Sequence, residues 1–287
     1  VVLLAKPTVP FNEFEKLSLD QYVMHGGKII IAIDRLEAEM DSLQILNQVI
    51  AYDRNLGITD MLFRYGVRIN PDLLMDLQCD YLPFDVNANG QFELLPWNYF
   101  PVMESTNNHP INKNLGFVSG RFVNTIDTVG DNTEIKKTVL LTSSKNSRSI
   151  GSPARISGSE NIIAPENERY NKSNISTAVL LEGKFQSFFA NRISTIYSDS
   201  LKNLGIPFVA KANKSGSVLV VSDGDVFLNE FTKQGPLEMG MNRFTDGTQY
   251  TFPFANKSFL LNSLDYFVNR DNLMESKSRE FIIRLLD

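Results

Sequence analysis

The chain has 287 residues, 43% of them hydrophobic and 21% charged, and a formal net charge of −5 at pH 7. This composition is typical of a globular chain with a sizeable core, and it excludes fibrous, disordered and coiled-coil proteins. Two histidines and one cysteine exclude a three-histidine metal site, an internal disulfide and a cysteine-based zinc or iron–sulfur site. The basic residues form neither an arm nor a stripe, so nucleic acid and anionic lipid surfaces are not the expected partners.

The first part of the chain alternates predicted strands and helices. Val1–Ala5 is a short apolar run, and Asn12 with Glu15 three residues later is a capping-box pattern that predicts a helix ending at the glycine pair 26–27. Lys28–Asp34 is a continuous β-branched run, typical of a strand that is covered on both faces. Strand, helix and strand at this spacing form a βαβ unit, whose right-handed crossover makes the two strands parallel. We therefore expect an α/β fold with an open, mostly parallel sheet and flanking helices.

The chain divides by composition into three regions within one domain of residues 1–287: an α/β half at 1–80, a strand-rich part at 81–216 and a returning α/β part at 217–287. A stretch rich in Ser, Asn, Pro and Gly, at about 143–176, is expected to be a long mobile loop. Further strands are predicted at 72–79, Tyr99–Met103, Ile135–Thr142, Ala178–Phe189 and Ser217–Ser222.

The last region also contains a predicted helix. An apolar stripe at i, i+4, i+7 and i+8 predicts this helix over Lys257–Asn269. The closing segment, Leu273–Asp287, is expected to be a strand or an extended arm.

Three carboxylates follow predicted buried strands. Asp34 ends the first of these strands, and Asp223 and Asp225 come directly after Ser217–Ser222. Ligands of open α/β sheets bind beyond the carboxyl ends of the strands, so these side chains are candidates for a ligand or interface site that holds a cation or accepts hydrogen bonds. The alternative is structural, because Asp is favoured in tight turns and as a helix cap. His109 leaves the same choice between a functional site and a hydrogen bond to a loop backbone.

Catalytic signatures are absent from the sequence. Cys79 lacks the flanking glycines of a nucleophile elbow, and a buried packing role is the alternative to a reactive thiol. No GxxxxGK[ST] occurs and no GxGxxG follows a strand, so a nucleotide or dinucleotide cofactor is not expected. We expect no enzymatic activity, no catalytic residue, no cofactor and no resident metal ion.

Several short segments, taken in order along the chain, resemble one known family. They are Lys6–Phe11, Asp20–Lys28, Ile33–Asp34, Asn108–Ile111, Val221–Asp225 and Arg284–Asp287. Together they resemble the GldG family of gliding-motility-associated ABC-transporter auxiliary proteins, which are of the substrate-binding type. The resemblance implies an amidotransferase-like (flavodoxin-like) core with additional strands, in a domain that lacks the amidotransferase nucleophile.

The same resemblance implies a location and partners. The chain would be the N-terminally truncated soluble domain of a membrane-anchored protein, on the periplasmic face of the bacterial inner membrane, with its anchors outside this fragment. Its partners would be an ABC permease and an ATPase, and its role a non-catalytic accessory function in gliding motility or envelope export through contact with the permease. Two alternatives stay open: a solute receptor for a glycan, peptide or lipid fragment in the crevice at the strand ends, and a divergent hydrolase of the amidotransferase-like fold.

Overall fold

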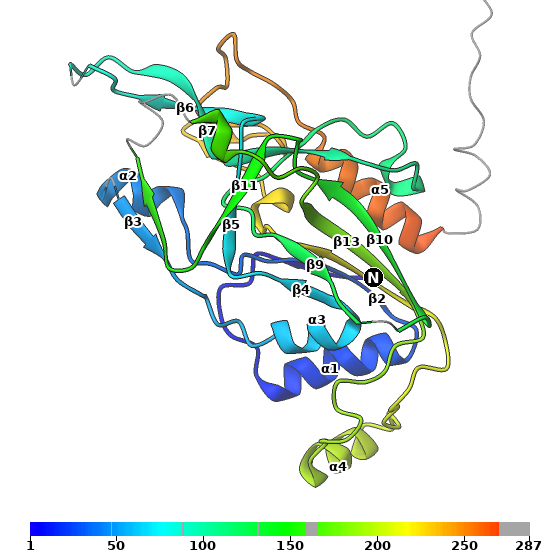
Figure 1. Ribbon diagram of the computed structural model, residues 1–287. Helices are drawn as coiled ribbons and strands as arrows, with labels where there is room; N and C mark the ends of the chain where they lie inside the picture. The colour runs from blue at the N-terminus through cyan, green and yellow to red at the C-terminus, as the bar shows by residue number, and fades with distance from the viewer. Residues whose placement is uncertain (47, 88, 131, 159–165, 270–287) are drawn as a thin grey trace, which may run out of the picture.

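A computed structural model describes residues 1–46, 48–87, 89–130, 132–158 and 166–269 of the protein (Figure 1). Its centre is a curled, mixed sheet with the strand order β1-β2-β14-β13-β10-β7-β6, in which β8 also pairs with β7. The strands of this sheet are β1 (Val2–Ala5), β2 (Lys28–Ala32), β6 (Cys79–Phe84), β7 (Glu93–Ser105), β8 (Val118–Ser119), β10 (Ile135–Thr142), β13 (Ser176–Gly183) and β14 (Gly216–Val221).

Strand direction changes across the sheet. β1 and β14 both run parallel to β2, which confirms the βαβ unit predicted at the start of the chain. From β14 onward every ladder is antiparallel, including those of β13 with β14 and with β10. The predicted open, mostly parallel sheet with flanking helices, of amidotransferase-like or flavodoxin-like type, is therefore wrong: the fold is mostly strands in a curled half-barrel. Antiparallel neighbours need no helical crossover, so the strand-rich half carries few helices.

Helices cover both faces of the parallel part of the sheet. α1 (Glu13–Met24) and α3 (Thr59–Tyr65) pack with Ile29 and Ile31 in one core, whereas α5 (Asn256–Val268) packs with Ile30 and Ala32 in a second core on the opposite face. Successive side chains of a strand point to opposite faces, which is why the β-branched run of β2 supplies both cores. The predicted burial of this strand on both faces is confirmed, since Ile29 to Ala32 are almost fully buried.

The two helices that the sequence predicted most directly are present. α1 begins with a complete capping box, in which the Asn12 side chain accepts from the Glu15 N–H and the Glu15 side chain accepts from the Asn12 N–H. α5 matches the helix predicted from the apolar stripe, within one residue at each end. The segment Leu273–Asp287, predicted as a strand or extended arm, lies outside the described residues, as do the terminal residues Arg284–Asp287 of the family resemblance.

Small two-stranded sheets accompany the main sheet, and two of them, β3–β12 and β5–β11, contribute to an aromatic core that includes Trp97 and Phe122. They pair β3 (Gln48–Ala51) with β12 (Ala154–Ser157), β4 (Val67–Ile69) with β9 (Ile126–Thr128), β5 (Asp72–Asp76) with β11 (Ser147–Gly151), and β15 (Phe231–Thr232) with β16 (Gly235–Pro236). The stretch at about 143–176 was expected to be a mobile loop, but its described part contains β11 and β12, because polar residues there pair with β5 and β3 from the first part of the chain. Residues 159–165 of this stretch lie outside the described residues. The predicted strand at 72–79 is divided between β5 and β6.

The remaining elements lie outside these sheets. They are α2 (Met40–Leu46), α4 (Thr195–Asn203) and the short 3₁₀ helices η1 (Pro110–Asn112), η3 (Asn167–Arg169) and η4 (Asp225–Phe227). The predicted strand over Ala178–Phe189 ends at Gly183, after which the chain leaves the sheet toward α4. Among the described residues, no helix combines the length and apolar character needed to cross a membrane.

Candidate functional site

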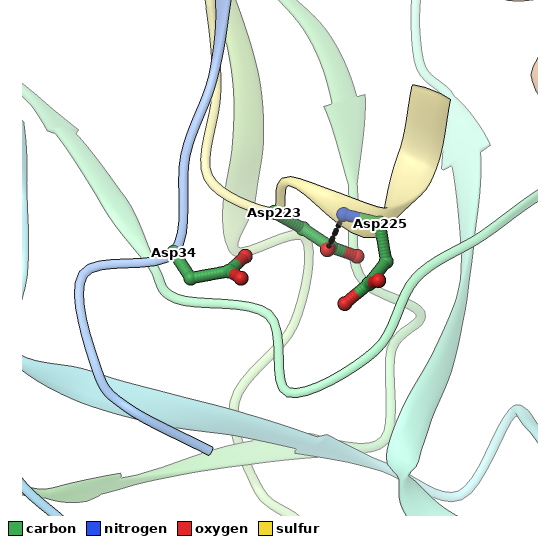
Figure 2. Close-up of side chains that lie close together, drawn as sticks. All are labelled: Asp34, Asp223 and Asp225. Atoms are coloured by element: carbon green, nitrogen blue, oxygen red, sulfur yellow. Dashed lines mark hydrogen bonds between the residues drawn. The ribbon is translucent and has the colours of Figure 1, made fainter. Parts of the chain in front are cut away.

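The candidate site forms where two parallel strands end side by side. Ala32 of β2 is paired with Val221 of β14, so the residues that follow the two strands emerge at the same edge of the sheet. The carboxylates of Asp34, Asp223 and Asp225, here called the carboxylate cluster, offer oxygen atoms that all lie within 4.8 Å of one another (Figure 2). Three candidates chosen from the sequence are thus brought together by the parallel pairing of β2 and β14.

Backbone N–H groups hold the buried members of the carboxylate cluster in place. Oδ1 of Asp34 accepts from the N–H of Gly224 at 2.6 Å. Oδ1 of Asp223 accepts from the N–H of Asp225 at 2.7 Å, and its Oδ2 accepts from the N–H of Arg121 at 2.6 Å. The Asp223–Asp225 bond is the turn interaction that the structural interpretation of these residues predicts. The cluster therefore also closes the turn between β14 and η4.

Lys6 supplies the positive charge of the site. Its Nζ lies 2.8 Å from both carboxylate oxygens of Asp225, 2.9 Å from Oε2 of Glu39 and 3.6 Å from Oδ2 of Asp34. Lys6 follows β1, the parallel neighbour of β2, and its backbone N–H donates to the carbonyl of Ala32. An ammonium group thus stands among the carboxylates where a bound cation would be expected, and it neutralises part of their charge.

The backbone around Lys6 is closely fitted to the neighbouring turn. Lys6 has a φ of +48°, in the left-handed region that residues with a side chain seldom adopt. A Cβ atom added to Gly224 would lie 2.6 Å from Cβ of Lys6. Only a glycine at position 224 therefore allows the Lys6 backbone to approach the turn closely enough for its ammonium to reach the carboxylates.

Burial and like charge make the carboxylate cluster bind protons tightly. Burial and the neighbouring Asp225 raise the pKa of Asp34 from 3.8 to about 6, against the opposing effect of Lys6. Burial, followed by Asp225 and Asp34, also raises the pKa of Asp223 well above its ordinary value. For Lys6, burial lowers the pKa but the attraction of Asp225 and Asp34 outweighs it, so the net shift is upward. Oδ2 of Asp34 is buried without a hydrogen-bond partner.

A pocket of about 360 Å³ opens beside the carboxylate cluster and is called the polar pocket here. Lys6, Glu39 and Asp225 lie at one side of it, and Arg121 and Glu230, which form an ion pair, lie at another. The Arg121 guanidinium also lies 5.0 Å from the centre of the Phe100 ring. The other residues that line the polar pocket include Met40, Phe122, Leu228, Phe231, Met241 and Arg243. The pocket thus presents fixed charges of both signs next to aromatic and methionine side chains.

The other two candidates from the sequence lie outside the polar pocket as the described residues define it. His109 caps η1, where its ring accepts from the N–H of Ile111, and it packs edge-on against Tyr266 of α5. Cys79 begins β6, and its thiol contacts the carbonyl of Leu77. Burial, followed by Asp76 and Asp80, raises the pKa of the Cys79 thiol to about 12. At neutral pH Cys79 is therefore a protonated thiol and a poor nucleophile.

Sequence reasoning missed Lys6 and Arg121. Lys6 had a detectable signal, since it follows the apolar run Val1–Ala5 just as Asp34 follows its strand, and parallel strands end at the same edge. Arg121 had none, because it lies in an irregular segment 102 residues from Asp223 in the chain, and only the folded sheet brings their atoms together.

Comparisons with known proteins give one family. The model of a family described as an ABC-type uncharacterized transport system matches residues 1–263. A search of curated proteins found no match. Among solved structures, the mmIFT52 N-terminal domain matches with 14% sequence identity and a TM-score of 0.44, over 94% of this chain and 78% of that one. A likeness at that score carries no argument about this chain.

Proposed function

The chain belongs to the family of the ABC-type uncharacterized transport system, whose members are auxiliary components of such a system, and on that premise we propose that it acts as a non-catalytic accessory subunit through direct contact with the permease. ATP hydrolysis would take place on a separate ATPase subunit. The observation that carries the proposal is the match of the family model to residues 1–263, which covers nearly the whole chain.

We assign the contact with the permease to the mouth of the polar pocket. Phe231 and Leu228 at this mouth are 67% and 39% exposed, and Arg243 and Met241 lie beside them. Aromatic, methionine and arginine side chains are the types enriched at protein interfaces, and a mixture of fixed charges adds specificity. Two ion pairs among the lining residues, Lys6 with Asp225 and Arg121 with Glu230, would hold this surface in one shape.

The absence of catalysis is part of the same proposal. A catalytic cysteine needs a thiolate, and the pKa of Cys79 is raised to about 12. The carboxylate cluster is bound by backbone N–H groups and by Lys6, which leaves few free oxygen positions for acid–base work. These contacts support a structural and electrostatic role for the cluster rather than a reaction.

The finer identity is also a proposal. The segments that resemble the GldG family favour a role in gliding motility or envelope export, with this domain on the periplasmic face of the bacterial inner membrane and an ABC permease and its ATPase as partners. The family match supports only the coarser statement that the chain is an auxiliary component of an ABC-type transport system.

Site-specific photo-crosslinking in cells tests the proposal. The crosslinking amino acid replaces Phe231 at the pocket mouth in the protein as its own cells express it, and membranes are solubilised after illumination. The matched control replaces Phe92, which is 68% exposed against 67% for Phe231 and does not line the polar pocket. The expected result is a crosslink to an ABC permease from position 231 and none from position 92. Recovery of neither the permease nor the ATPase, by crosslinking or by pull-down, would refute the proposal.

The polar pocket itself favours a second candidate function, that of a solute receptor. Its volume of about 360 Å³ and its mixed charges suit a small polar solute such as a fragment of a glycan, peptide or lipid headgroup. A ligand that binds only the folded state stabilises it by about 2.7 kcal/mol at a hundred times its Kd. A thermal-shift screen against these three classes tests the idea, with Phe231→Ala expected to reduce the shift and Phe92→Ala expected to leave it unchanged. No shift with any class would exclude the receptor.

A further inference from the structure

The segment between β13 and β14, residues 184–215, leaves the main sheet and carries α4 at its far end. We call it the α4 excursion. In Figure 1, α4 lies apart from the sheets, below α1. Its inner side is anchored by Leu201, which is 5% exposed and packs with Leu17 of α1 and Phe189. The excursion is thus a fixed projection of the fold, attached through a small apolar cluster.

The α4 excursion has the opposite charge to the rest of the protein. Its basic side chains, all exposed, are Lys184, Arg192, Lys202, Lys211 and Lys214. Asp199 is its one acidic residue, whereas the whole chain has a net charge of −5. The basic residues are separated along this one continuous segment and so form no run; Lys202 pairs with Asp199 at 3.4 Å and Lys211 with Glu134 at 2.9 Å. This concentration of positive charge fits an anionic partner.

Aliphatic side chains on the same excursion face solvent. Ile196 of α4 is 74% exposed, and Leu204 and Ile206, which follow the helix, are 63% and 42% exposed. Because Leu201 already provides the buried side of the helix, these three side chains are not needed for the attachment of α4. Of the basic residues only Lys202 lies on α4 itself, so the excursion combines exposed aliphatic side chains at and after the helix with basic residues that mostly precede or follow it. Exposed aliphatic and basic side chains in one segment are typical of segments that lie in a membrane interface.

A pocket of about 790 Å³ lies at the root of the α4 excursion. Arg64, Arg192 and Lys211 line it, together with Phe63, which is 55% exposed. Two carboxylates, Asp60 and Glu134, also line the pocket. Glu134 pairs with Lys211 at 2.9 Å, which leaves the two guanidinium groups as the basic groups available to a ligand. Guanidinium groups bind phosphate oxygens with paired hydrogen bonds, so the pocket fits a phosphate-bearing headgroup.

We propose that the α4 excursion docks on the surface of an anionic phospholipid bilayer. Ile196, Leu204 and Ile206 enter the interface, and the basic residues of the excursion lie against the headgroup phosphates. The sequence expectation that anionic lipid is not a partner considered only contiguous runs of basic residues, whereas the excursion has five basic residues against one acidic residue without forming a run. The excursion and the polar pocket share no lining residue, so this proposal does not depend on the permease contact.

Vesicle co-sedimentation of the 287-residue chain tests the proposal. Vesicles of phosphatidylcholine alone are compared with vesicles that also contain phosphatidylglycerol. We expect binding to the anionic vesicles alone, and a loss of binding as salt is raised, since salt screens exposed charges. Leu204→Ser is expected to weaken binding about tenfold, and Lys202→Gln about fivefold.

Matched controls lie on α5. Leu261→Ser replaces another exposed leucine, at 50% exposure, and Lys257→Gln replaces another exposed, ion-paired lysine. Both controls are expected to bind like the wild type, and unchanged thermal melts would show that each variant is folded. Equal binding to neutral and anionic vesicles, equal effects of Leu204→Ser and Leu261→Ser, or no vesicle binding would each overturn the proposal. The last result would assign the surface to a protein partner instead.

Discussion

Replacing Lys6 with methionine removes the positive charge from the carboxylate cluster and keeps a straight side chain of similar length. The Lys6 side chain is only 14% exposed, and its Nζ lies within 2.9 Å of Asp225 and Glu39. Removing one partner from a buried ion pair costs about 3–5 kcal/mol, because the other charge is left buried without compensation. Asp225 and Glu39 are 21% and 35% exposed at their side chains, so water relieves part of the cost. We expect a loss of about 3 kcal/mol in the free energy of unfolding at pH 7.

The loss from Lys6→Met should depend on pH. Without the Lys6 ammonium, the pKa of Asp34 rises above about 6, since the opposing attraction is gone while burial and Asp225 remain. Protonation of Asp34 then relieves the repulsion at low pH. The variant is therefore expected to lose more stability at pH 8 than at pH 5.

Urea unfolding followed by circular dichroism at both pH values measures these differences. The control is Lys257→Met, which breaks an exposed ion pair with Glu238 and should change the stability little, because solvent screens exposed ion pairs. A loss for Lys6→Met no larger than that for Lys257→Met, or a loss that is the same at pH 5 and pH 8, would refute the view that Lys6 neutralises buried carboxylates.

Three further predictions concern the neighbouring residues. The raised pKa of Asp34 means that the folded state binds its proton more tightly than the unfolded state, so its contribution to stability is fully present below pH 3.8 and is lost as pH rises through about 6; urea titrations should show a smaller decline over this window in Asp34→Asn, and an unchanged decline would contradict the assignment. Gly224→Ala should cost about 1–3 kcal/mol through its clash with Lys6, whereas Gly151→Ala, which meets open space, should cost much less; equal melting temperatures would count against the close approach. The Cys79 thiol, with its pKa raised to about 12, should react with Ellman's reagent far more slowly in the native protein than in urea, and equal rates would restore it as a candidate nucleophile.

Features that depend on neighbours in the chain were predictable from the sequence. The capping box of Asn12 and Glu15 involves residues within one turn of helix, and the apolar stripe of α5 is a helical pattern that can be seen in the sequence of α5 alone. Both helices were therefore located to within about a residue. The β-branched run of β2 predicted burial on both faces for the same reason. Its parallel pairing with β1 followed from the handedness of a single crossover.

Features that depend on distant pairing were not predictable in this way. The two strands within 143–176 have polar sequences, and they form because β3 and β5, about a hundred and about seventy-five residues earlier, offer them an edge. The direction of β13, antiparallel to both neighbours, is likewise a property of the pairs and not of its own residues. The βαβ unit correctly predicted parallel strands at the start of the chain, but it gave no information on the direction of the later strands, which are antiparallel.

The candidate site also has one part that the sequence predicted and another that only the fold determined. The sequence by itself determined that Asp34 and Asp223 follow buried strands, because strand ends can be recognised from local composition. Only the tertiary structure decided that Lys6 stands among these carboxylates, that Arg121 is bound to Asp223, and that His109 packs elsewhere against α5. Charges that are scattered along a chain have no mutual energy until the fold brings them within a few ångströms, so the assembly of this cluster is a consequence of strand order and not of any motif.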